Sequence, residues 1–136
     1  MIGPLASILQ LFYALFLMGV GAYGIFFLDW EVSTFYALGP EAFVGTEGAT
    51  LRNQFRFLKA IELAFGIFAI VYRRDILSGG LNCTIFLTGV FLGAFARGLS
   101  WILDGTPLPA YRAFLLAEVV IFLAVWLNAR RAMARP

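Results

Sequence analysis

The sequence contains no histidine and only one cysteine, Cys83. Without histidine the chain cannot form histidine-ligated haem, histidine-based zinc sites or imidazole acid–base chemistry. A single cysteine cannot form an intrachain disulfide, so cysteine usage does not indicate a redox compartment. The sequence also lacks any pattern that resembles a nucleophile motif, a metal-ligand set or a phosphate-binding loop. We therefore expect no bound cofactor and name no catalytic residue.

Charged residues are also scarce, at 13% of the chain, whereas 62% is hydrophobic and the mean hydropathy is +0.89. A soluble domain of ordinary composition has a charged fraction of about 25%. The composition therefore predicts a membrane protein. Four apolar runs each approach the ~20 residues that are needed to cross a ~30 Å hydrocarbon core. They are residues 5–28, 51–72, 81–103 and 110–127.

These runs predict an all-α fold, an integral membrane antiparallel bundle of four transmembrane helices that forms a single domain over residues 1–136. The first run could be mistaken for an export signal, but no basic region precedes it and it lacks a small-residue cleavage site. We therefore expect it to remain as a helix.

Basic residues are missing from two connections, residues 29–49 and 104–109. They occur instead after the second and fourth runs, as Arg73, Arg74, Arg130, Arg131 and Arg135. The positive-inside rule then predicts that both chain ends are cytoplasmic and that the two connections without basic residues face outward. We expect a multi-pass membrane protein; in a bacterium, this would be a protein of the cytoplasmic (inner) membrane.

The first run contains Gly19, Gly21 and Gly24 in the letter pattern of a dinucleotide-binding fingerprint. That fingerprint must follow a strand and open a helix, whereas this pattern lies within an apolar span. Small residues let neighbouring backbones approach closely in lipid. Because Gly21 and Gly24 share a helix face with Ala14 and Leu17, we predict that this face packs against another helix.

The connection at residues 29–49 interleaves four acidic residues with aromatic side chains, and Gly39-Pro40 breaks it in two. Such a segment suits a short helix along the outer interface, or a cap over the mouth of the bundle. A solvated loop with an aromatic anchor is the alternative, since long connections are often either functional or disordered.

The second run carries a stripe of charge although it is long enough to span a membrane. At roughly 100° per residue, Arg52, Arg56, Lys59 and Glu62 fall on one helix face about 120° wide. An ionisable group at the bilayer centre costs on the order of 2.5 to 3.5 kcal/mol. The stripe must therefore face partners or water inside the bundle, and Lys59 is close enough to Glu62 along the helix to pair with it.

The third and fourth runs carry polar groups at a similar depth, in the outer half of the membrane. At 1.5 Å per residue, Arg97 lies roughly 10 Å below the outer end of its helix and Glu118 about 12 Å. Arg97 and Asp104 are two turns apart, so we expect Arg97 to contact Glu118 or Glu62 instead. The predicted ligand or ion-pair cluster comprises Asn53, Arg56, Lys59, Glu62, Arg97, Ser100, Asp104 and Glu118.

Three uses of this cluster remain open. Interhelical ion pairs would fix which helices meet, because breaking a buried pair costs ~3 to 5 kcal/mol. A cavity open to the outer leaflet would bind an amphiphile, with its anionic head on the surplus cation and its tail on aromatic side chains. The third use is a relay for protons or ions, or an enzyme with Glu62 and Glu118 as acid and base.

Three short motifs occur in order before Glu118 in the last helix: Asn53-Gln54-Phe55-Arg56-Phe57, Arg97-Gly98-Leu99-Ser100 and Asp104-Gly105-Thr106-Pro107. With them the chain resembles, over nearly its whole length, the bacterial four-helix membrane family catalogued as domain of unknown function 4345. In that family the residue after the asparagine is usually acidic, whereas Gln54 makes the local charge here more positive. The resemblance supports the helix count and the choice of site residues, and it implies no reaction.

The architecture is more distantly similar to that of DoxX-like four-helix proteins, some of which accompany respiratory or redox enzymes or assist membrane complexes. That similarity is one of fold, and fold does not transfer function.

We expect a non-enzymatic integral membrane protein, an accessory subunit or amphiphile-binding module in which Arg56, Lys59 and Arg97 hold an anionic group. Its expected partners are the lipid bilayer, a bound lipid or amphiphile, and a larger membrane complex or homo-oligomer, with no nucleic acid. A membrane enzyme or redox-complex subunit acting on a quinone- or sterol-like lipid is the alternative. An oligomeric proton or ion transporter is a third possibility.

Overall fold

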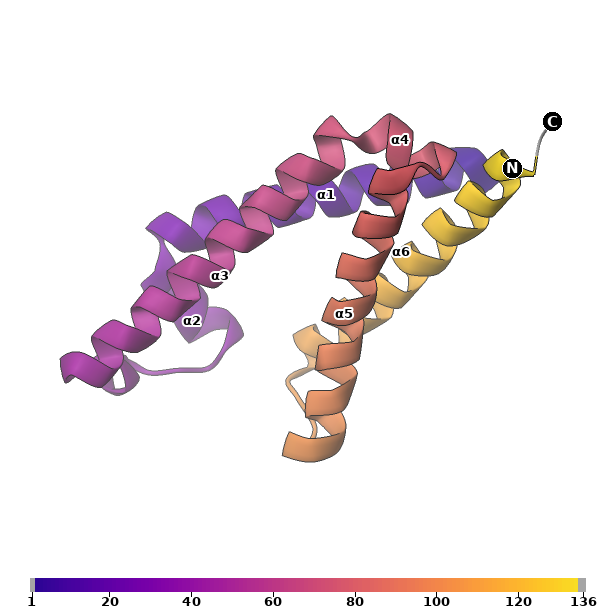
Figure 1. Ribbon diagram of the computed structural model, residues 1–136. Coiled ribbons are helices and arrows are strands. Elements are labelled where there is room, and N and C mark those ends of the chain that lie inside the picture. Colours follow the sequence, from indigo (N-terminus) through magenta and orange to yellow (C-terminus); the bar gives the residue numbers. More distant parts are fainter. Residues whose placement is uncertain (1, 135–136) are drawn as a thin grey trace. The chain divides into compact units, whose positions relative to one another are not determined.

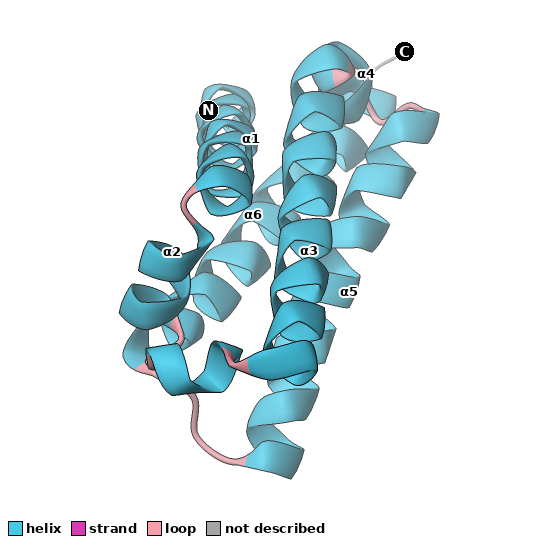
Figure 2. Cartoon of the chain, turned by 90° about the vertical axis from the view of Figure 1, so that its left-hand side faces the viewer, coloured by secondary structure: helices cyan, strands magenta, loops and turns pink. Residues whose placement is uncertain are grey.

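The computed structural model describes residues 2–134, and every regular element within them is a helix (Figure 2). The predicted all-α fold is therefore confirmed for this part of the chain. The elements are α1 (Ile2–Phe26), α2 (Leu28–Phe35), the short 3-10 helix η1 (Pro40–Phe43), α3 (Gly45–Val71), α4 (Arg73–Ser78), α5 (Leu81–Asp104) and α6 (Pro109–Met133). Arg135, part of the predicted basic cluster, lies outside the described residues.

Three of these helices are long and apolar enough to cross a membrane, namely α1 over Gly3–Phe26, α5 and α6. The second predicted span corresponds to α3, which begins at Gly45, six residues before the predicted start. Arg56, Lys59 and Glu62 interrupt its apolar part, so composition alone does not mark α3 as a span. The helices are compatible with a membrane protein that has three strongly apolar segments.

The chain divides into two compact units, and each is described by itself. One unit contains the start of α1, up to Tyr13, together with the chain from Ala69 onward, and the other contains Ala14–Phe68. In the first unit α5 and α6 lie side by side and antiparallel, and α4 packs against both (Figure 1). The buried side chains of this unit include those of Ile76, Phe86 and Val125.

A buried amide joins α1 to the end of α3 in the first unit. The side chain of Gln10 is fully buried, and its Nε2 donates to the backbone oxygen of Ala69 at 2.7 Å. Arg73 donates through Nε to Gln10 Oε1 at 3.1 Å and through Nη2 to the backbone oxygen of Ser7 at 2.9 Å. The guanidinium of Arg73 is thus held by the first turns of α1, which fixes α1 beside α4.

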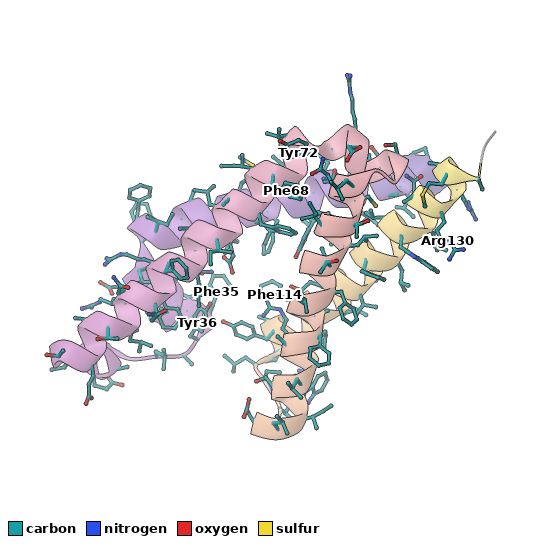
Figure 3. All side chains as sticks on the ribbon, in the orientation of Figure 1. Phe35, Tyr36, Phe68, Tyr72, Phe114 and Arg130 are labelled. Carbon is teal, nitrogen blue, oxygen red and sulfur yellow. The ribbon has the colours of Figure 1, made fainter. Side chains whose placement is uncertain are left out.

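The last turns of α6 lie beside α4 and beside the start of α1. Asn128 donates through Nδ2 to the backbone oxygen of Leu77 at 2.8 Å. A Cβ built on Gly3 would lie 3.4 Å from Asn128 Oδ1, which is close van der Waals contact. Arg130, labelled in Figure 3, lies one turn from the end of α6, with its Cζ 5.3 Å from the centroid of the Trp126 ring. The start of α1 and the end of α6 are therefore neighbours.

In the second unit, α1 and α3 approach each other through glycines. A Cβ built on Gly21 would lie within 3 Å of the backbone oxygen of Lys59 and the backbone nitrogen of Leu63. On α3, a Cβ built on Gly66 would lie 2.8 Å from the backbone oxygen of Ala14 on α1. The predicted small-residue packing face is confirmed, because only glycine permits this backbone separation.

The connection at residues 29–49 is mostly helical and contains α2, η1 and the start of α3. α2 and η1 bury Leu28, Val32 and Phe43 in a small core of their own. Tyr36, labelled in Figure 3, directly follows α2. Its ring packs edge-on against that of Phe55, with 4.9 Å between the ring centroids. The short-helix prediction is therefore confirmed and the solvated-loop alternative is wrong. The location of this segment at the outer membrane interface stays a prediction.

The glycine contact predicts that Gly21→Val lowers the free energy of unfolding by about 1 to 3 kcal/mol, because the added methyl groups overlap the α3 backbone. The measurement is unfolding of the protein in maltoside micelles by titrated dodecyl sulfate. Gly19→Val on the same helix is the matched control, since a Cβ there meets nothing within 4 Å. Equal losses in the two variants would contradict the packing described here.

Candidate functional site

One face of α2 is directed toward α3. This face is formed by Leu28, Glu31 and Val32 at helical spacing. This face brings Glu31 to Lys59, and both residues are only 3% exposed. Lys59 Nζ lies 2.5 Å from Glu31 Oε1 and 2.8 Å from Glu62 Oε2. We call Glu31, Lys59 and Glu62 the Lys59 triad.

The triad neutralises a lysine that would otherwise be buried with its charge unpaired. The pairing of Lys59 with Glu62 is local, three residues apart on α3, whereas Glu31 comes from a different helix. The close approach of Gly24 on α1 completes the enclosure, because a Cβ built there would lie 2.6 Å from Lys59 Cδ. Two carboxylates on one ammonium leave a net charge of −1 if all three side chains are ionised.

The cations that precede Lys59 on α3 have different surroundings. Arg52 is half-buried and pairs with Asp29, with 3.1 Å between Nη2 and Oδ1, and its Cζ lies 5.1 Å from the centroid of the Phe43 ring. Arg56 is exposed, and its Nε donates to the backbone oxygen of Ile25 at 3.3 Å, in the last turn of α1. No carboxylate pairs with Arg56 among the described residues.

A second ion pair lies in the other unit, between α5 and α6. Arg97 Nε donates to both carboxylate oxygens of Glu118 at 3.2 Å, and the Glu118 side chain is 9% exposed against 34% for Arg97. The Cζ of Arg97 also lies 5.8 Å from the ring centroid of Tyr111 and 5.7 Å from that of Phe114, which is labelled in Figure 3. A Cβ on Gly93 would be 3.6 Å from Glu118 Oε1, so a small residue on α5 faces the carboxylate.

The remaining predicted site residues lie on exposed helix surface. Ser100 Oγ donates to Asp104 Oδ2 at 2.7 Å within the last turns of α5. Asn53 is exposed on α3. The described residues contain no group of three or more metal-ligating side chains. The chemistry offered by the site is therefore the chemistry of carboxylates, one ammonium and guanidinium groups.

The comparison with protein-family models gives a match over residues 5–128 to the family described as "Domain of unknown function (DUF4345)". The chain belongs to this family. Searches of the curated proteins and of the solved structures each give no match. The DUF4345 match thus covers nearly all the described helices. Membership of this family assigns no reaction to the ion-paired residues.

The predicted cluster of this DUF4345 protein is seen as two ion-paired groups, one in each unit. Lys59 contacts Glu62 as predicted, and Arg97 contacts Glu118, which was one of two predicted partners. That all these groups share one depth in the membrane stays a prediction. The ligand roles predicted for Lys59 and Arg97 also stay predictions, although both cations are already paired with carboxylates.

Sequence reasoning missed three contributors, namely Glu31, Asp29 as the partner of Arg52, and Gln10. Gln10 had a visible signal, because it is an amide within an otherwise apolar run and such a group must find a partner in hydrocarbon. Glu31 had none, since it lies 28 positions before Lys59 and only the turn of the chain at Phe27 brings α2 against α3.

The ion pair between α5 and α6 predicts that Arg97→Leu lowers the free energy of unfolding by about 2 to 3 kcal/mol. This is less than the ~3 to 5 kcal/mol for breaking a fully buried pair, because Arg97 is partly exposed. Asp104→Asn, at an exposed position on the same helix, should change the same dodecyl sulfate unfolding by no more than about 0.5 kcal/mol. If Arg97→Leu were as mild as this control, the pair would contribute nothing to the α5–α6 contact.

Proposed function

We propose that this DUF4345 protein is a non-enzymatic, multi-pass protein of the bacterial cytoplasmic membrane that binds an amphiphile with an anionic headgroup at Arg56. α3 is its fourth membrane-spanning helix, and both chain ends are cytoplasmic. The observation that carries the binding proposal is the exposed guanidinium of Arg56, which has no carboxylate partner among the described residues.

The contacts of α3 with α1 support α3 as a span. α3 meets α1 through Gly66 and Ala14 in one unit, and Ala69 accepts from Gln10 in the other. At 1.5 Å per residue its 27 residues are about 40 Å long, enough to cross a bilayer. The charge of Lys59 is enclosed in the triad, so it does not have to face acyl chains.

The close approach of Gly3 on α1 to Asn128 on α6 supports an even number of membrane spans. If α1 and α6 both cross the membrane and the start of α1 lies beside the end of α6, the two chain ends are on one side. An odd number of spans would put them on opposite sides. The basic residues Arg130 and Arg131 at the end of α6 make that side the cytoplasm by the positive-inside rule.

Labelling of single cysteines distinguishes four spans from three. In a Cys83→Ser background, we introduce cysteine at the exposed positions Glu41, Ser78 and Thr106, one at a time. With four spans, a membrane-impermeant maleimide applied to intact cells labels Glu41→Cys and Thr106→Cys, and reaches Ser78→Cys only after permeabilisation. With three spans, Glu41→Cys and Ser78→Cys would behave alike, which would overturn the proposed topology.

The position of Arg56 suits an anionic headgroup. Its side chain lies at the last turn of α1, where the uncompensated carbonyl groups favour a cation. One Nε contact to Ile25 leaves the outer nitrogens of the guanidinium available, and a planar guanidinium matches the oxygens of a phosphate or carboxylate. Within residues 14–68 the other two cations, Arg52 and Lys59, are paired with acids.

Apolar surface lies next to this guanidinium and suits the tail of the amphiphile. Phe26 and Phe27 follow Ile25 directly in the chain and are 77% and 57% exposed. The Phe27 ring stacks on Tyr23 at 4.7 Å, and Tyr23 meets Trp30 edge-on at 5.3 Å. Tyrosine and tryptophan are enriched at the level of lipid headgroups, which is where such a head would lie.

Arg56→Gln should weaken binding of an anionic lipid roughly tenfold or more, because a hydrogen bond to a charged group contributes about 1.5 to 3 kcal/mol. The measurement is native mass spectrometry of the protein in maltoside micelles titrated with phosphatidylglycerol, with phosphatidylcholine as the lipid control. The wild type should retain phosphatidylglycerol in preference to phosphatidylcholine.

Arg112→Gln is the matched control for Arg56→Gln. Arg112 is an exposed arginine in the first turn of α6, so its removal changes the net charge equally without touching the proposed site. Equal loss of lipid in the two variants would mean that only the net charge matters. Full retention by Arg56→Gln would remove Arg56 from the site.

A further inference from the structure

A cavity of about 210 Å³ lies within the second unit, between α2, η1 and α3. A water molecule takes about 30 Å³ of liquid volume, so a cavity of this size has room for about seven waters. Sites for drug-sized ligands are about 300 to 1,000 Å³. The cavity therefore suits a small metabolite rather than the tail of an amphiphile.

Apolar side chains form one part of the cavity wall, namely those of Val32, Leu38, Pro40 and Phe43. Val32 and Phe43 belong to the small core of α2 and η1, so packing holds this wall in place. Such a wall offers no hydrogen bond from its side chains, and it suits an apolar substituent. Asp29 also lines the cavity and its side chain is 75% exposed, so a ligand reaches the carboxylate from outside.

A charged pair forms the polar part of the wall. Arg52 contacts Asp29 through Nε at 3.2 Å and through Nη2 at 3.1 Å, and both contacts use Oδ1. Oδ2 of the same carboxylate is left to accept from a ligand. Arg52 also donates through Nη1 to the backbone oxygen of Phe43 at 3.4 Å. A guanidinium has five N–H groups, so one N–H remains on each terminal nitrogen.

The ion pair in the wall has no net charge, so a ligand with a charge of one sign would leave that charge uncompensated in the cavity. A zwitterion matches both members of the pair. Its ammonium group donates to Oδ2 of Asp29, and its carboxylate accepts from the two remaining N–H groups of Arg52, since a planar guanidinium matches two carboxylate oxygens. A Cβ built on Gly39 would overlap the carboxylate of Glu41, which places a second attraction for the ammonium group beside the cavity wall.

We propose that this cavity binds the zwitterion of a free α-amino acid with an apolar side chain. The two charged ends of the ligand contact Asp29 and Arg52, and its side chain packs on Val32, Leu38 and Phe43. The headgroup of phosphatidylethanolamine has the same two signs of charge, but it has no apolar substituent for these walls. The site does not use Arg56, and the proposal goes beyond the function proposed above.

Isothermal titration calorimetry of the full-length protein in maltoside micelles tests the site, with leucine as the probe. Isoamylamine is leucine without its carboxylate, and isocaproate is leucine without its ammonium group. Each should bind the wild type about tenfold more weakly than leucine or worse, because each loses a hydrogen bond between charged groups. This series needs no variant, so it does not depend on how a substitution affects folding. No binding of leucine, or equal binding of the three ligands, would overturn the proposal.

Asp29→Asn and Arg52→Gln should each weaken the binding of leucine about tenfold or more, for the same reason. Asp104→Asn and Arg112→Gln are the matched controls, because they make the same changes of charge at exposed positions in the other unit. Both controls should bind leucine as the wild type does. Equal losses in the controls and in the site variants would contradict a site at this cavity.

Two further measurements separate this site from the proposed lipid site. Arg56→Gln should keep its affinity for leucine whether or not it retains phosphatidylglycerol, so the two proposals fail independently. O-phosphoethanolamine, the soluble headgroup of phosphatidylethanolamine, should bind more weakly than leucine because it leaves the apolar wall uncovered. Tighter binding of O-phosphoethanolamine than of leucine would overturn the amino-acid assignment in favour of a lipid headgroup.

Discussion

The second unit depends on the need to neutralise Lys59. This lysine lies on the face of α3 that meets the glycines of α1, where water does not solvate its ammonium group. An unpaired buried charge would cost several kcal/mol, so carboxylates must reach it. Glu62 comes from the same helix, and Glu31 comes from α2, which folds back directly after α1. The lysine thus ties α2 to α3.

Polar contacts have the same role elsewhere in the chain. Arg97 meets Glu118 between α5 and α6, and Gln10 joins α1 to the end of α3. Between helices in lipid, apolar surface alone gives little preference for one neighbour over another, because acyl chains are as apolar as leucine. A buried hydrogen-bonding group, in contrast, has few acceptable partners. These pairs therefore select which helices meet.

The proposed amphiphile ligand follows from a charge that the ion pairs do not neutralise. Arg56 has no carboxylate partner among the described residues, and it lies beside exposed phenylalanine side chains. Together these features suit an anionic amphiphile. Around the triad the charges balance as a sum, with Arg52, Arg56 and Lys59 against Asp29, Glu31 and Glu62, but they do not balance locally. The uneven pairing leaves Arg56 as the site for the amphiphile.

The sequence by itself determined the features that depend on helical periodicity. It predicted the apolar runs, the packing face at Gly21 and the local pair of Lys59 with Glu62, because helix geometry relates residues three or four apart. Only the tertiary structure decided that Glu31 completes the triad, that Arg97 meets Glu118, and that Arg56 has no carboxylate partner within residues 2–134. These contacts join distant parts of the chain, and they depend on the turn at Phe27 and on which helices become neighbours, neither of which a period of 3.6 residues encodes.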